Sequence, residues 1–232
     1  SYNIGVGTQA GYAISTGVNN TLIGGLAGDA ITTASYNTAL GYTSLGLNTT
    51  GADNVAVGWA ALGANTTGSD NVAVGKQALD ANTTGATNTA LGDRALTTNT
   101  TASNNTAVGS DALYANTTGY SNTALGMSSA QANTTGYENT SIGTTAGQDV
   151  TTGLRNTFVG AKAGQYGVGT TTGDKNVIVG AYSHASAVGV SSANIFGYAL
   201  VGDEAYTTVG YGSNDIRAAH GNVTWATVSD ER

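Results

Sequence analysis

The sequence predicts an all-β protein, a parallel β-solenoid built from 17-residue coils. Three observations support this prediction. A 17-residue unit recurs ten times without a change of phase, each unit contains a short alternating apolar pattern that ends in glycine, and the 232-residue chain has 35 Gly but no Pro and no Cys. This period is too short for a helix pair or a propeller blade and suits one turn of a solenoid.

Each unit begins with an asparagine, which we call position 1, and a glycine follows at position 5. The ten asparagines are Asn3, Asn20, Asn37, Asn54, Asn71, Asn88, Asn105, Asn122, Asn139 and Asn156. Stacked coils would bring equivalent side chains about 4.8 Å apart, which allows amides and hydroxyls to hydrogen-bond along the stack. We therefore expect a structural ladder through Asn54, Asn71, Asn88, Asn105, Asn122 and Asn139.

Positions 2 to 5 read as a short strand. Position 2 is Val or Thr in the central units, position 3 is small and position 4 is a branched aliphatic residue. Alternation of this kind is typical of a strand with one face on a core, and the glycine lets the chain turn. We expect the core at position 4, in Val57, Val74, Leu91, Val108, Leu125 and Ile142. The small position 3 is expected to face a neighbouring chain at close range.

The second half of the unit contains a further apolar pair and a polar segment. A small residue at position 8 precedes Leu at position 9 in the central copies, and we expect this pair to form a second buried contact. Asn-Thr-Thr-Gly at positions 12 to 15 is expected to form a second strand and turn. From residue 1 to 175, charged side chains occur only at positions 6, 7, 10, 11, 16 and 17. These positions are therefore expected to form the surface.

A coil of this kind buries little apolar area. Each unit supplies only three or four aliphatic side chains for seventeen ordered residues, and apolar burial is the main force that offsets the entropy of ordering. We expect several chains to associate, most simply as a homotrimer about a three-fold axis.

The repeat divides the chain into three parts. We expect a solenoid shaft over residues 1–180, because the unit that starts at Asn156 runs twenty residues to Asn176 and the next asparagine, Asn194, is out of phase. Residues 181–212 keep strand-like alternation without the asparagines, which predicts a cap or neck. Residues 213–232 form a C-terminal segment with His220, Trp225 and dense charge.

The repeat N-[TV]-A-[VLI]-G-x-x-[AS], over roughly residues 1–180, resembles the head repeats of trimeric autotransporter adhesins. It is still more similar to the Asn-Thr-Ala-Leu-Gly arrays of bacteriophage tail fibres. The resemblance implies a left-handed parallel β-roll that associates as a trimer. Adhesin heads usually have shorter repeats, so the 17-residue period departs from that family.

The end of the chain carries a second resemblance. The segment from Trp225 to Arg232, WATVSDER, is similar to the junction that precedes the intramolecular chaperone domain of phage tail fibres and endosialidases. This implies self-cleavage after Ser229, with Asp230 as the first residue of the released part, when a downstream chaperone domain is present. A matured shaft would end at Ser229, whereas this chain continues to Arg232.

Composition argues against several classes of protein. The net charge of −7 with scattered Lys and Arg disfavours a nucleic-acid partner, because such proteins concentrate positive charge on one face. No apolar run approaches the eighteen or so residues that a membrane span needs. The two histidines, His184 and His220, are far apart in sequence, so we expect no enzyme. Asp53 and Asp70 are not repeated in the next coils, which disfavours a calcium row, and we expect no metal and no cofactor.

Three further patterns have alternative explanations. The Asn-Thr-Thr triplets match glycosylation acceptor sites, but the coil period explains them without sugar. Regular threonines are also a feature of ice-binding solenoids. At the variable position 6, Tyr42 and Trp59 lie one coil apart and are candidates for contact with a sugar or a protein partner.

These features together favour a structural and adhesive fibre segment of a phage tail fibre, located in the virion, which spaces and presents an end that binds a host cell-surface glycan or protein. The alternatives are the head of a bacterial surface trimeric adhesin and, less favoured, an ice-binding or glycan-depolymerising solenoid.

Overall fold

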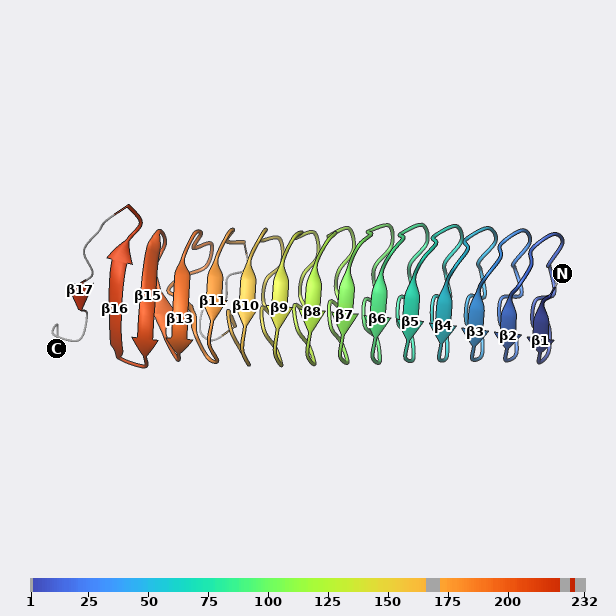
Figure 1. Ribbon diagram of the computed structural model, residues 1–232, viewed down its shortest axis with the longest axis horizontal. Helices are drawn as coiled ribbons and strands as arrows, with labels where there is room; N and C mark the ends of the chain where they lie inside the picture. The colour runs from blue at the N-terminus through green and yellow to red at the C-terminus, as the bar shows by residue number, and fades with distance from the viewer. Residues whose placement is uncertain (1, 166–171, 222–225, 228–232) are drawn as a thin grey trace.

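Each 17-residue unit forms one coil with a single short strand, and the coils stack into a rod (Figure 1). The computed structural model describes residues 2–165, 172–221 and 226–227. Within these residues there is no helix, and hence none that could cross a membrane. The prediction of an all-β parallel solenoid is confirmed, with about twelve coils.

One sheet runs the length of the rod. Its strands, in spatial order, are β1 Ile4–Val6, β2 Thr21–Ile23, β3 Thr38–Leu40, β4 Val55–Val57, β5 Val72–Val74, β6 Thr89–Leu91, β7 Thr106–Val108, β8 Thr123–Leu125, β9 Thr140–Ile142, β10 Thr157–Val159, β11 Val177–Val179, β13 Asn194–Tyr198, β15 Tyr206–Tyr211, β16 Asn214–Ala219 and β17 Ala226–Thr227. A separate pair is formed by β12, His184–Ala185, and β14, Val201–Gly202. Neighbours from β1 to β15 are parallel, and equivalent positions face each other, as in Ala73 opposite Ala90. Twelve steps of about 4.8 Å give a stack of about 58 Å from β1 to β15.

The glycine at position 5 is needed where the strand ends. Gly58 has a φ of +136°, and a Cβ there would lie 2.5 Å from the carbonyl oxygen of Gly75 in the next coil. No side chain fits that approach, so glycine repeats at this position in every coil from Gly7 to Gly197.

The interior is lined by positions 3, 8 and 9. In the fifth coil these are Ala73, Ala78 and Leu79, all fully buried. The expected burial at positions 8 and 9 is confirmed, but the two strand faces are the reverse of the prediction. Position 3 faces the lumen of its own coil and not a neighbouring chain.

The predicted core at position 4 is therefore wrong for the single chain. Val57 and Val108 are half-buried, whereas Val74, Leu91, Leu125 and Ile142 are exposed. The physical reason is the narrow lumen. The strand lies so close to the opposite side of the coil that only alanine fits at position 3 when leucine occupies position 9.

In two coils the large and the small residue are exchanged between these two positions. The tenth coil has Phe158 at position 3 and Gly164 at position 9, and a Cβ on Gly164 would lie 2.5 Å from the Phe158 ring. The second coil makes the same exchange with Leu22 and Gly28. Volume-conserving exchange of this kind is the form of core change that proteins tolerate best.

The predicted asparagine ladder at position 1 is present and buried. The backbone N–H of Asn71 donates to Asn54 Oδ1 (3.0 Å), and its Nδ2 donates to the carbonyl oxygen of Gly85 at the end of its own coil (2.9 Å). Each asparagine thus joins its coil to the preceding coil through the backbone bond, and its side chain connects the start of its own coil to the end of that coil. The members with backbone bonds of this kind are Asn20, Asn37, Asn54, Asn71, Asn88, Asn105, Asn122, Asn139, Asn156 and Asn176.

A second asparagine ladder occupies position 12. Asn82 Nδ2 donates both to Asn65 Oδ1 and to the Gly85 carbonyl oxygen, each at 2.9 Å. The ladder comprises Asn48, Asn65, Asn82, Asn99, Asn116 and Asn133. Val150 takes the equivalent place in the ninth coil, so Asn133 Oδ1 is left without a donor in the described residues.

The expected second strand at Asn-Thr-Thr-Gly is not formed in the described coils. The backbone N–H groups of Thr66 and Thr67 both donate to the carbonyl oxygen of Thr83, at 2.9 and 3.2 Å. Two consecutive donors to one acceptor do not produce strand pairing. A threonine hydroxyl does hydrogen-bond along the stack, since Thr66 Oγ1 also donates to the Thr83 carbonyl oxygen (3.0 Å).

The stack continues beyond residue 180, the expected end of the shaft. Strand β11 pairs with β13 and β13 with β15, both in parallel. Ala193 takes position 1 and donates its N–H to Asn176 Oδ1 (3.0 Å), which explains why Asn194 is out of phase. The parallel stack ends where β16 turns back antiparallel to β15, and β17 follows β16 in the same sheet.

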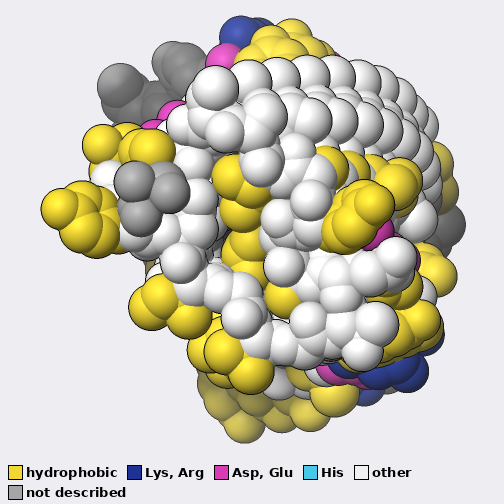
Figure 2. Space-filling model, turned by 90° about the vertical axis from the view of Figure 1, so that its right-hand side faces the viewer, with side chains coloured by type: hydrophobic (Ala, Val, Ile, Leu, Met, Phe, Trp, Pro, Cys, Tyr) yellow, Lys and Arg dark blue, Asp and Glu magenta, His cyan; other side chains and the backbone are white. Residues whose placement is uncertain are grey.

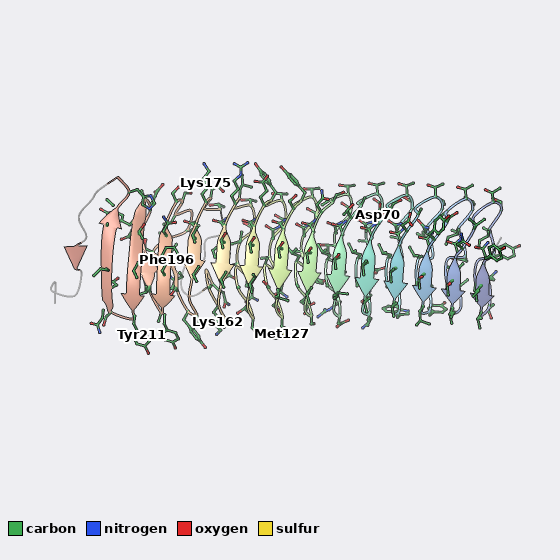
Figure 3. All side chains as sticks on the ribbon, viewed as in Figure 1. Asp70, Met127, Lys162, Lys175, Phe196 and Tyr211 are labelled. Carbon is green, nitrogen blue, oxygen red and sulfur yellow. The ribbon has the colours of Figure 1, made fainter. Side chains whose placement is uncertain are left out.

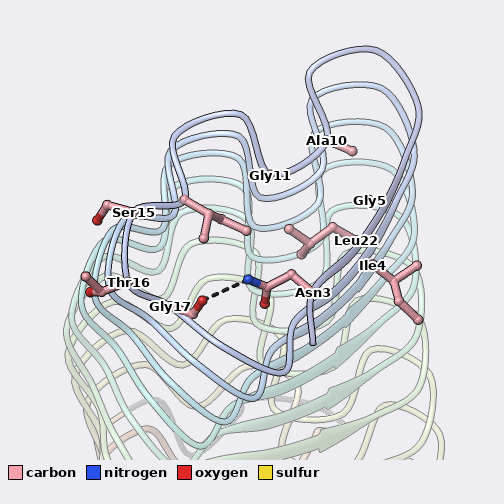
Figure 4. Close-up of a pocket in the computed structure, with 10 residues that line it drawn as sticks. Asn3, Ile4, Gly5, Ala10, Gly11, Ser15, Thr16, Gly17 and Leu22 are labelled. Atoms are coloured by element: carbon pink, nitrogen blue, oxygen red, sulfur yellow. Dashed lines mark hydrogen bonds between the residues drawn. The ribbon is translucent and has the colours of Figure 1, made fainter. Parts of the chain in front are cut away.

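The N-terminal end of the rod contains a hollow. At the N-terminal end the first coil is open, and hydrophobic side chains are visible in its hollow (Figure 2). This hollow has a volume of about 350 Å³, lies beside Gly5 and Gly11, and is crossed by the bond from Asn3 Nδ2 to the Gly17 carbonyl oxygen (2.8 Å; Figure 4). The predicted cleavage residues, Ser229 and Asp230, lie outside the described residues.

Candidate functional site: the outer sheet face

The most extensive candidate site is the outward surface of the sheet, which we call the outer face. It consists of the side chains at positions 2 and 4 of β1 to β11, β13 and β15. Because paired residues project on the same side of a sheet, Ile216 of β16 extends this surface beside Val209.

Position 4 contributes a row of aliphatic and aromatic side chains. In chain order the row is Val6, Ile23, Leu40, Val57, Val74, Leu91, Val108, Leu125, Ile142, Val159, Val179, Phe196 and Val209. Leu125 is 46% exposed and Val74 37%. Position 2 is Thr, Val or Ile, except Asn194.

No charged residue occupies the outer face from β1 to β15. Charged side chains at positions 6 and 17 lie along its two edges, whereas those at positions 7, 10 and 11 lie on another side of the coil. Figure 3 shows Asp70 and Lys175 at one edge, Met127 and Tyr211 at the other, and Phe196 on the sheet between them. A continuous uncharged apolar strip with polar edges is a feature of interaction surfaces and is uncommon on monomeric soluble proteins.

The edges themselves are stabilised between coils. Arg155 Nε donates to Glu138 Oε2 (2.7 Å), and the rings of Tyr120 and Tyr137 stack with their centroids 4.7 Å apart. Hydrogen bonding to Glu138 raises the pKa of the Arg155 guanidinium. These contacts join neighbouring coils and leave the outer face unobstructed.

The two aromatic residues singled out from the sequence do lie at the surface. Tyr42 is 55% and Trp59 46% exposed, and the Lys76 ammonium stands 5.6 Å from the centre of the Trp59 ring. A cation over an indole is a favourable contact. Contact of Tyr42 or Trp59 with a partner stays a prediction.

No protein-family model, curated protein or solved structure matches this chain. The interpretation of the outer face therefore depends on its own geometry and chemistry.

The two histidines contact different parts of the chain. His184 Nδ1 contacts the Ala185 carbonyl oxygen (2.8 Å), whereas His220 Nε2 contacts Asn194 Nδ2 (3.1 Å). Within residues 2–165, 172–221 and 226–227, no three His, Asp or Glu side chains converge as metal ligands. The Asn-Thr-Thr asparagines are buried and donate their Nδ2 groups within the fold, so they are not accessible as glycosylation sites in the folded coil.

Sequence reasoning identified the residues of the outer face but assigned them to the core. A signal for the correct assignment was present. Position 3 is small in most of the ten units, and where it is large, at Leu22 and Phe158, position 9 is Gly28 or Gly164. Such compensation is expected only between side chains that share one enclosed space.

Proposed function

We propose that this chain is a structural and adhesive fibre segment in which three copies associate through their outer faces. The observation that carries the proposal is the uncharged aliphatic row at position 4, which extends over thirteen strands. Packing this row against equivalent rows would bury the side chains that the narrow lumen cannot accommodate.

Rotational symmetry about an axis along the rod suits this surface. Such an axis places the same residue of each copy at the same height, so Val meets Val and Leu meets Leu in successive layers. A closed cyclic assembly also leaves no apolar face open to further copies. Three chains are favoured by the resemblance of the repeat to trimeric fibres.

We further propose that the fibre belongs to a bacteriophage tail, where it spaces and presents an end that binds a host glycan or protein. The Asn-Thr-Ala-Leu-Gly repeat and the WATVSDER segment support this assignment. A bacterial surface adhesin is the alternative, supported by the same repeat.

Association can be tested with Val74→Asp and Val108→Asp, with Lys76→Asp as the control at the sheet edge. We expect the wild-type chain to have three times the monomer mass in sedimentation equilibrium. The two outer-face substitutions would place charges in the interface and should give monomers that keep the β-sheet circular dichroism spectrum. A monomeric wild-type chain, or trimers in both Val→Asp variants, would refute the proposal.

A second function is favoured by one observation on the same face. Position 2 is threonine in eight of the strands, at Thr21, Thr38, Thr89, Thr106, Thr123, Thr140, Thr157 and Thr207. A regular uncharged row of threonines beside aliphatic side chains would suit ice binding if the face stays in water. Thermal hysteresis by a monomeric chain would favour this function, whereas a stable trimer covers the face.

A further inference from the structure

A longitudinal groove lies on a different side of the rod from the outer face. In the first coil the chain is indented at Gly11, while Ile4 points out on another side (Figure 4). In later coils residues at position 7 form one wall of this groove, residues at position 11 form the other, and position 10 lies between them.

Side chains cross this groove in the central coils. Arg94 lies 5.5 Å over the Tyr114 ring, and Thr145 Oγ1 donates to Gln165 Oε1 (3.1 Å). Gln131, Gln148 and Gln165 form a further row, with Nε2 to Oε1 distances of 2.8 and 2.9 Å. The groove is therefore occupied by the protein's own side chains from about the sixth to the tenth coil.

The groove is open in the second to fifth coils. Gly46 and Gly63 occupy position 10 in two successive coils, which leaves a space of about 370 Å³. Its walls include Leu26 and Leu47. Leu47 is 58% exposed, and position 11 is the smaller alanine in both adjacent coils. The lining is thus mainly apolar.

A carboxylate closes each end of this space. Asp29 and Asp80 both line it from position 10, three coils apart, or about 14 Å between their backbone positions. Each leans inward. Asp29 Oδ1 is 3.7 Å from the place of a Cβ on Gly46, and Asp80 Oδ1 is 2.7 Å from the place of a Cβ on Gly63.

These carboxylates have no cationic partner among the described residues, where the ion pairs involve other acidic side chains. Burial raises the pKa of the Asp80 carboxyl, against the smaller effect of its hydrogen bond from Gln77. An ionised Asp80 is therefore poorly solvated and would gain from a nearby cation.

We propose that the groove binds a short linear aliphatic diamine. One ammonium group pairs with Asp29, the other pairs with Asp80, and the methylene chain lies over Gly46 and Gly63 between the two leucines. Charge complementarity at both ends and an apolar, side-chain-free floor between them fit this class of ligand. The outer face takes no part, so the proposal is independent of chain association.

The test is an NMR titration of the folded wild-type protein with 1,5-diaminopentane, followed at the methyl groups of Leu26 and Leu47. Pentylamine and 1,5-pentanediol are the ligands that lack one and both ammonium groups. We expect saturable shifts at both leucines, with the diamine binding about tenfold more tightly than pentylamine and the diol not binding, because each end forms a charge-assisted hydrogen bond.

Variants locate the site. Asp29→Asn and Asp80→Asn keep the side-chain shape and should each weaken diamine binding about tenfold or more. Ala64→Leu should abolish binding by filling the groove, whereas Ala132→Leu, at the same position of a distant coil, should leave it unchanged. Absence of saturable binding, equal affinity of the diamine and pentylamine, or unchanged affinity in both Asp→Asn variants would overturn the proposal. None of these outcomes alters the mass of the assembly, which tests the proposed fibre separately.

Discussion

At the scale of single residues, the solenoid depends on backbone conformations that most residues avoid. Position 17 has a positive φ near 58° in coil after coil, as in Asp53, Asp70 and Thr87. Asn and Asp tolerate the left-handed region, whereas a β-branched residue there is strained. The chain therefore stores local strain wherever position 17 is not Asn, Asp or Gly.

Relief of this strain gives a residue-scale prediction. Thr87→Asn should stabilise the protein by about 1 kcal/mol, because asparagine adopts the left-handed conformation at lower cost. The matched control is Thr84→Asn, an exposed threonine of the same coil without a positive φ. Thermal and urea melts should show a gain for Thr87→Asn only, and equal effects would contradict the explanation.

At the scale of the coil, stability rests on a shared lumen and on the two asparagine ladders. The lumen has one large residue per coil in most units, at position 9 in the third to seventh coils and at position 3 in the tenth. The ladders use buried amides that are hydrogen-bonded through most of the rod. They therefore fix the register between neighbouring coils without leaving buried polar groups unpaired.

The exchange of volume can be measured with a double-mutant cycle. Phe158→Ala should cost about 3–5 kcal/mol through the cavity that it leaves, and Gly164→Leu alone should be destabilising because its Cβ meets the Phe158 ring. The double variant recreates the Ala and Leu pair of coils such as the fourth, where Leu62 has a φ of 51°.

We expect the double variant to be more stable than either single variant, with a coupling energy of about 1–3 kcal/mol in urea unfolding. Additive losses would show that positions 3 and 9 do not share one space.

At the scale of the whole molecule, the rod is a one-dimensional stack in which each coil contacts its neighbours. Stability should therefore be a sum of coil and interface terms. Deleting residues 88–104, one complete unit, should preserve the fold and shorten the rod by about 4.8 Å.

Deleting only residues 88–95 should destroy the phase of every later ladder and prevent folding of that part. Small-angle scattering measures the length, and circular dichroism measures the retained sheet. A folded product of the shorter deletion with an unchanged melting temperature would contradict this description of the rod.

The sequence allowed the period, the strand position and the asparagine ladder to be predicted, because each depends on residues that recur in phase. It did not settle which face of the strand is enclosed. Alternation places Val72 and Val74 on one face and Ala73 on the other, but it does not show which face points into the coil. The width of the coil decides which face is enclosed. This width depends on how closely the backbone at position 3 approaches the backbone at position 9. The groove was also missed, because Asp29 and Asp80 line one space only through the absence of side chains at Gly46 and Gly63.

The second asparagine ladder has one further consequence. From Asn65 to Asn133, every Nδ2 donates to the Oδ1 of the coil before it, so five successive amide dipoles point the same way along the rod. Backbone bonds between coils run in both directions, as from Val72 N–H to the Asn88 carbonyl oxygen and from Gly75 N–H to that of Val57. Their dipoles largely cancel. The second ladder therefore carries an electrical polarity in its side chains, one that ends at the unpaired Oδ1 of Asn133.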